Sequence, residues 1–126
     1  MTLDLLAGDY AICRLNADAA LPTSVASAAF WSVTRTADEL SLVCEAGDAP
    51  AGSAAERGYR GLKVRGPLSF SQVGVIASLS SVLAAASLSI FVVSTYDTDY
   101  LFVRGVDLDR AIEALRQAGH TVAIDA

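Results

Sequence analysis

The stretch from Gly66 to Val103 reads GPLSFSQVGVIASLSSVLAAASLSIFVVSTYDTDYLFV, and the rest of the chain is organised around it. A Gly-Pro turn opens the stretch, and a run of Ala, Leu, Ser and Val follows with its larger apolar residues at helical spacing. We therefore expect a helix over residues 71–85. The residues predicted on its buried face are Val73, Ile76, Leu79 and Leu83.

The second half of the stretch has the composition of a strand. Residues 88–94 include Ile, Phe and two Val, which favour extended backbone, and residues 100–103 form a second such run. The sequence Ser-Thr-Tyr-Asp-Thr-Asp joins them as an acidic turn. Any function that this sequence reveals is expected where the Gly-Pro turn meets the acidic turn.

The segments on either side of this stretch complete a sheet. Residues 59–65 alternate apolar and basic side chains and predict a strand. After the stretch, Asp107 is the predicted cap of a helix that ends at Gly119, and residues 121–124 predict a last strand. The order from residue 62 onward is strand, helix, strand, strand, helix, strand, which is the ferredoxin-like plan.

The first half of the chain follows a shorter version of this plan. Strands are expected at 10–15, 30–34 and 40–44, and a shift of 60 positions lays the last two over the central hairpin. The expected remainder is a lead at 1–8, a short helix or irregular turn at 16–27, a loop at 47–52, and at most a helical turn at 53–57.

The fold class that follows is α+β, with two ferredoxin-like (βαββαβ) units packed as one compact tandem. The first unit is predicted over residues 1–58 with reduced helices, and the second over residues 59–126.

Composition narrows the range of partners. The chain has 126 residues, is 53% hydrophobic, carries a formal net charge of −5 and has a pI of about 4.6. An acidic chain does not suit nucleic acid, whose binding depends on Lys and Arg, nor an anionic membrane surface. The first residues include Asp4 and no basic cluster, so we expect no signal peptide and a cytoplasmic location.

Cys13 and Cys44 each lie in an apolar run, and we expect two buried free thiols. A disulfide between them is the alternative, but nothing else in the sequence marks a secreted protein.

The uncharged residues 73–93 are long enough to span a bilayer, and this reading is the alternative to a helix followed by a strand. The stretch contains five serines, and its pattern changes midway from helix-like to strand-like. A helix and a buried strand explain that change better than one membrane span.

Three segments resemble the ACT-domain family, in particular the short bacterial tandem-ACT proteins. They are residues 59–68, 74–79 and 89–100, and residues 9–45 resemble the family's first unit more weakly. The related proteins are the regulatory domain of aspartate kinase and the cytosolic arginine sensor. The resemblance implies a non-catalytic regulatory module, without a cofactor, that binds an amino acid at an interface between ACT units. It also implies a homodimer.

In the arginine sensor an acidic residue just before the third strand holds the ligand, and by resemblance that role falls on Asp99. The turn between the first strand and first helix, here residues 66–74, supplies backbone groups to the ligand.

The residues themselves fit an amino-acid ligand. A carboxylate is stabilised by the N–H groups at a helix start, and an ammonium by Asp97 or Asp99. Each residue also has a purely structural reading, in which Ser69 or Ser71 caps the helix and the Asp residues form an Asx turn. The predicted ligand-binding residues are Gly66, Pro67, Ser69, Phe70, Val73, Gly74, Thr95, Tyr96, Asp97 and Asp99.

Catalysis and metal binding have little support in the sequence. His120 is the only histidine, and no Cys, Asp or Glu lies around it at metal-ligand spacing. No nucleophile motif is present, so an enzyme would require a polar cleft with converging acids around His120. The main alternative to an amino-acid-binding module is therefore a ligand-free module for protein interaction or oligomerisation.

Overall fold

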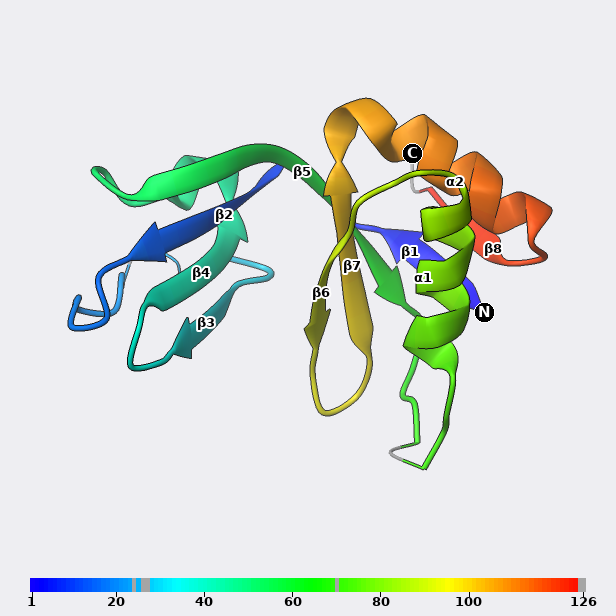
Figure 1. Ribbon diagram of the computed structural model, residues 1–126, viewed down its shortest axis with the longest axis horizontal. Helices are drawn as coiled ribbons and strands as arrows, with labels where there is room; N and C mark the ends of the chain where they lie inside the picture. The colour runs from blue at the N-terminus through cyan, green and yellow to red at the C-terminus, as the bar shows by residue number, and fades with distance from the viewer. Residues whose placement is uncertain (24, 26–27, 70, 125–126) are drawn as a thin grey trace. The chain divides into compact units, whose positions relative to one another are not determined.

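The computed structural model describes residues 1–23, 25, 28–69 and 71–124. Within them the chain divides into two units, which we call the large unit (Met1–Ala7 and Arg60–Ala126) and the small unit (Gly8–Tyr59). The strands are β1 (Thr2–Leu5), β2 (Tyr10–Leu15), β3 (Ser32–Arg35), β4 (Leu40–Glu45), β5 (Ala54–Val64), β6 (Phe91–Ser94), β7 (Asp99–Arg104) and β8 (Thr121–Ala123). The α-helices are α1 (Val75–Ala85) and α2 (Leu108–Gln117) (Figure 1).

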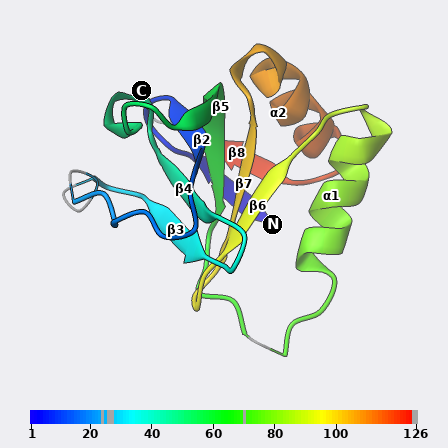
Figure 2. The ribbon, with the colours of Figure 1, turned by 60° about the vertical axis from the view of Figure 1, so that its left-hand side comes forward.

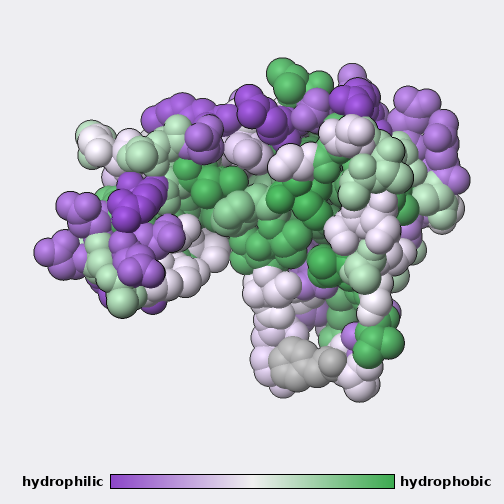
Figure 3. Space-filling model, in the orientation of Figure 1, coloured by the Kyte–Doolittle hydropathy of each residue, from purple (hydrophilic) through white to green (hydrophobic). Residues whose placement is uncertain are grey.

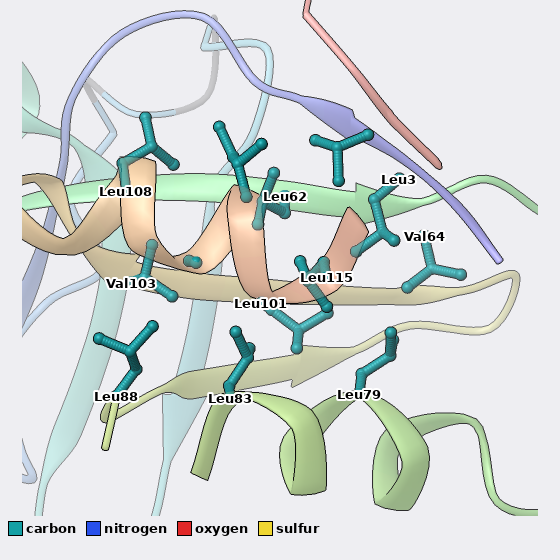
Figure 4. Close-up of a cluster of buried hydrophobic side chains, with 13 residues drawn as sticks. Leu3, Leu62, Val64, Leu79, Leu83, Leu88, Leu101, Val103, Leu108 and Leu115 are labelled. Atoms are coloured by element: carbon teal, nitrogen blue, oxygen red, sulfur yellow. The ribbon is translucent and has the colours of Figure 1, made fainter. Parts of the chain in front are cut away.

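The large unit has the expected βαββαβ order, formed by the end of β5, α1, β6, β7, α2 and β8. Its strands lie in the order β6-β7-β5-β1-β8, and the two helices cover one face (Figure 2). Leucines from both helices point into a core shared with the sheet (Figure 4). The fold class predicted from the sequence is confirmed for this unit.

β1 was expected to be only a lead, and that prediction is wrong. Leu3 is fully buried opposite Val64, and β1 runs antiparallel to β5 and parallel to β8. The expected first unit, 1–58, therefore differs from the small unit at its start, because residues 1–7 lie in the large unit. The partners of β1 lie about 60 or more residues away, so no local pattern around it shows the pairing.

The small unit consists of four antiparallel strands in the order β3-β4-β2-β5. This is the strand order of a ferredoxin-like sheet, and its described residues contain no α-helix. The Arg35 guanidinium bonds the carbonyls of Ala17 and Ala19 and so fixes the irregular segment that follows β2. A 3-10 turn, Ala46–Asp48, follows β4.

The region 53–57 was expected to be a helical turn at most, and this is wrong, because β5 begins at Ala54. The first part of β5 pairs with β2, and its last part pairs with β1. A single strand thus contributes to both units.

Both cysteines are free and buried, as expected. They lie in the core of the small unit, Cys13 opposite Leu42 and Cys44 opposite Ala11. Burial, followed by the neighbouring Cys13 thiol, raises the pKa of Cys44 to about 12, so this thiol is a small apolar side chain at neutral pH.

The helix ends differ in part from the expected ones. α1 begins at Val75 instead of residue 71, so Val73 lies outside it and is 90% exposed rather than buried. Asp107 precedes α2 but makes no side-chain capping bond. Its Oδ1 instead lies 3.6 Å from a guanidinium nitrogen of Arg110. Gly119 ends α2 with a φ of 94°, as expected for a C′ glycine.

The strand expected from residue 88 begins at Phe91. Ser87 has a φ of 61°, and the Leu88 N–H still bonds the Leu83 carbonyl at the end of the helix. Among the described residues, no helix is both long and apolar enough to cross a membrane.

The buried position of β1 leads to a stability prediction. Leu3→Ala removes a fully buried side chain from the core of the large unit and should lower the free energy of unfolding by about 2–5 kcal/mol. Urea unfolding followed by circular dichroism measures the change.

Leu21→Ala is the control, because Leu21 is 59% exposed in the small unit and should change stability by less than about 0.5 kcal/mol. Equal, small effects of both substitutions would contradict the insertion of β1 into the core.

Candidate functional site

Two hydrogen bonds join the end of β5 and the turn that follows it to the turn between β6 and β7. The Leu68 N–H donates to the Asp97 carbonyl at 2.6 Å, and the Thr98 hydroxyl donates to the Val64 carbonyl at 2.5 Å. Thr98 is only 4% exposed. The two turns therefore lie side by side, as both ribbon views show (Figures 1 and 2). This is the meeting of turns that the sequence predicts.

Gly66 permits this close approach. A Cβ at position 66 would lie 3.1 Å from the Asp97 carbonyl oxygen and from the Leu68 nitrogen, and 3.2 Å from the Thr98 Cβ. Two of these three atoms belong to backbone and cannot rotate away. Gly66 thus acts on the site through the backbone geometry of the two turns.

The acidic turn is fixed mainly by its threonines. The Thr95 N–H and hydroxyl both donate to the Thr98 carbonyl, at 2.8 and 3.1 Å, and the Thr98 N–H donates to the Thr95 hydroxyl at 3.3 Å. Tyr96 and Asp97 lie at the exposed tip of this turn. The turn therefore does not depend on an Asx bond from Asp97.

Asp99 begins β7 and lies opposite Ser94 at the end of β6. The Ser94 hydroxyl donates to Asp99 Oδ1 at 2.5 Å, which orients the carboxylate. Asp99 is half-buried, so an ion pair at its other oxygen would be less screened by solvent than one at a fully exposed group.

The N-terminus of α1 lies on the other side of the site. Gly74 is its N-cap, with a φ of 81°, and none of the described side chains caps the helix. No acidic residue lies in the first turn. The backbone N–H groups of this turn are therefore available to an anion, and the helix dipole adds a positive partial charge.

The structural reading of Ser69 and Ser71 as helix caps is wrong. Their hydroxyls lie 2.8 Å apart, and the Ser71 N–H donates to the Ser69 hydroxyl at 3.2 Å. These bonds stabilise the loop before α1 and leave its first turn uncapped.

These elements surround a cavity of about 410 Å³ in the large unit. The lining residues are Leu68, Ser69, Gln72, Gly74, Val75, Ile76, Ala77, Ser94, Thr95, Tyr96, Asp97, Thr98 and Asp99. Two carboxylates and a helix N-terminus line the cavity, and no Lys or Arg is among its described lining residues. Such a lining suits a small ligand that carries both a cationic and an anionic group.

Six of the ten predicted ligand-binding residues line this cavity: Ser69, Gly74, Thr95, Tyr96, Asp97 and Asp99. Gly66, Pro67 and Val73 do not line it. Phe70 lies outside the described residues. The sequence reasoning missed the first turn of α1, because it expected the helix to begin before Gly74. It also missed Ser94, although its place opposite Asp99 follows from the hairpin register.

His120 lies away from this cavity. Its Nδ1 is 3.1 Å from the Met1 amino nitrogen, and burial, followed by the charge of that amino group, lowers its pKa. Among the described residues, no group of three or more His, Cys, Asp or Glu side chains is placed to hold a metal ion.

The ACT-domain family model matches residues 54–117, and a second model, for an N-terminal domain, matches residues 8–51. The chain belongs to the ACT-domain family. None of the curated proteins compared with it matches.

Solved structures agree with this assignment. An Agobacterium tumefaciens protein is 38% identical, with a TM-score of 0.92 over 99% of this chain and 93% of its own. A Vibrio cholerae protein, described as a possible transport protein of unknown function, is 27% identical, with a TM-score of 0.74 over 93% of this chain and 88% of its own.

The regulatory subunit of aspartate kinase from Thermus thermophilus has the same fold. It is 14% identical, with a TM-score of 0.62 over 93% of this chain and 94% of its own.

The contact around Gly66 gives a second prediction. Gly66→Ala forces a Cβ against two backbone atoms, and we expect it to destabilise the protein by about 1–3 kcal/mol and to disturb the cavity. Thermal unfolding and the backbone amide NMR shifts of Leu68 and Thr98 measure both effects.

Gly47→Ala is the matched control, because no described atom beyond its chain neighbours lies within 4 Å of a Cβ at that position. If Gly66→Ala proved as neutral as Gly47→Ala, the close packing of the two turns would be refuted.

Proposed function

We propose that this protein is a non-catalytic regulatory module that binds a free amino acid in the cavity of the large unit. The observation that carries the proposal is the pairing, across one cavity, of an uncapped helix N-terminus with the carboxylate of Asp99. A free amino acid carries the two complementary groups on adjacent atoms. The cavity, at about 410 Å³, also has the size of a small-molecule site.

The α-carboxylate of the ligand would bind at the first turn of α1. The N–H groups of Val75, Ile76 and Ala77 have no i−4 partner within the helix, whose first such bond is from Ser78 to Gly74. Because Gly74 has no side chain, a ligand approaches these donors without obstruction.

The α-ammonium group would pair with Asp99. Ser94 occupies Oδ1 and leaves Oδ2 for the ligand. A charge-assisted hydrogen bond in a partly buried site contributes about 1.5–3 kcal/mol. Asp97, also in the lining, supplies a second negative charge, while Leu68, Ile76 and Tyr96 offer apolar surface to the ligand's side chain.

Assembly is part of the same proposal. In the family an amino acid binds at an interface between ACT units, and a homodimer is the expected state here. We expect no cofactor, because the proposed role requires only reversible binding of a ligand, and binding by itself stabilises the folded state. The cytoplasmic location stays a prediction.

A ligand-free interaction module is the second candidate function. Val73 and Tyr96 are 90% and 80% exposed, Val73 beside the cavity-lining Gln72 and Gly74 and Tyr96 in the lining itself. The face of the large unit over α1 is weakly polar or apolar (Figure 3). Such side chains favour contact with another protein over solvent.

A thermal-unfolding screen against the twenty amino acids tests the proposal. A ligand at 100 times its dissociation constant should stabilise the protein by about 2.7 kcal/mol. Asp99→Asn removes the charge at nearly constant shape and should weaken binding by roughly 10- to 100-fold, as the loss of 1.5–3 kcal/mol implies. Isothermal titration calorimetry on the best ligand measures that loss.

Asp109→Asn is the matched control, since Asp109 is an exposed acid on α2 outside the cavity lining and should leave affinity unchanged. If no amino acid stabilised the wild-type protein, the binding proposal would fail and the interaction module would replace it. If a ligand bound the wild-type protein and Asp99→Asn with equal affinity, its ammonium group would not pair with Asp99.

A further inference from the structure

β1 occupies a slot between two strands of the large unit. It is antiparallel to β5 and parallel to β8, so β5 and β8 are antiparallel to each other. Among the described residues β8 pairs with no strand except β1. In a plain βαββαβ sheet these two strands would be direct neighbours, so β1 is an insertion into an otherwise complete motif.

The slot holds an extended segment with an acid between two apolar residues. Leu3 and Leu5 pair with Val64 and Leu62 and pack in the core. Asp4 accepts two hydrogen bonds from Arg65, at 3.1 and 2.5 Å. The bond from Arg65 also lowers the pKa of Asp4, so the carboxylate stays charged at neutral pH.

Backbone bonds complete the slot at both ends. The Leu6 N–H donates to the Gly61 carbonyl, and the Arg65 N–H donates to the Thr2 carbonyl, both at 2.8 Å. On the β8 side, the Thr121 N–H donates to the Met1 carbonyl at 2.9 Å. Every partner of β1 named here belongs to β5, β8 or the residues next to them.

The connection from β1 to the rest of the chain is short and exposed. β1 ends at Leu5 and β2 begins at Tyr10, yet the two strands lie in different units. Between them Ala7, Gly8 and Asp9 are exposed, and Gly8 has a φ of 83°, with no described atom beyond its chain neighbours within 4 Å of where a Cβ would lie. A change of backbone angles at Gly8 redirects β1 without breaking a core contact there.

We propose that β1 exchanges between two copies of this chain, so that β1 of each copy fills the slot of the other. All the contacts described above are then formed between copies instead of within one, and the result is a closed symmetric dimer. The partner that this slot fits is therefore a second copy of the chain.

Cross-linking between two different variants tests the exchange. Thr2 and Thr121 are directly opposite each other in β1 and β8. Thr2→Cys and Thr121→Cys are purified separately as full chains, mixed at about 10 µM and oxidised with copper phenanthroline. A covalent heterodimer with a 2–121 disulfide, identified by mass spectrometry, is expected only when β1 of one copy lies in the slot of the other.

The controls define the outcomes. A chain with both substitutions should form the 2–121 link, and failure to link at all would overturn the pairing and the proposal with it. Thr121→Cys mixed with Val106→Cys, an 86% exposed position, gives the rate of random collision. A seated strand has an effective concentration of about 1 mM, so linkage should exceed this rate by about 100-fold. Linkage at the collision rate would overturn the exchange.

The ion pair of the slot supplies a test of specificity. Asp4→Arg added to the Thr2→Cys chain places two cations together at Arg65 and should abolish most of the heterodimer. Arg65→Asp added to the Thr121→Cys chain should restore it. If neither substitution changed the yield of the cross-linked heterodimer, the cross-link would not form through the slot.

Discussion

Two hydrogen bonds, from Leu68 N–H to the Asp97 carbonyl and from the Thr98 hydroxyl to the Val64 carbonyl, fix the geometry of the cavity. They join segments about 30 residues apart in the chain, and Gly66 is the residue that lets the backbones meet. Because Thr98 is buried, loss of its hydroxyl partner would leave a polar group unsatisfied, which costs more than the bond itself contributes. The position of Asp99 relative to α1 follows from this contact.

Both units are completed by strands that the order of the sequence would assign elsewhere. β5 is the last strand of the small unit and the first strand of the motif in the large unit. β1 precedes the small unit in sequence but pairs within the large one. The two units are therefore not consecutive in the sequence. The chain passes from the large unit to the small one after Ala7 and returns to the large unit at Arg60, so a single boundary does not describe the division.

The sequence was most informative where one local pattern determines the structure. The apolar spacing of α2 and the glycine that ends it were sufficient, and so was the β6–β7 hairpin with its acidic turn. It was least informative where distant pairing decides. Ala54–Arg57 has poor strand propensity, yet it belongs to the part of β5 that pairs with β2. The start of the helix was also mispredicted, because Val73 fits the helical spacing but lies before the N-cap Gly74. Because the helix was expected to begin before Gly74, the two turns were predicted as the site and the first turn of α1 was not.

The weak internal repeat does not imply two equal sites. The chemistry proposed here needs a helix N-terminus for the carboxylate and an acid at the start of the third strand for the ammonium. In the small unit, Glu39 precedes the third strand, but its described residues contain no α-helix to supply the N–H groups. A second cavity, of about 390 Å³, is lined there by Arg14, Asn16 and Asp18 among others, at the end of β2 rather than at a hairpin turn. Among the described residues, the arrangement proposed to bind an amino acid, a helix N-terminus together with an acid, thus occurs in the large unit, and the small unit contributes strands rather than a copy of it.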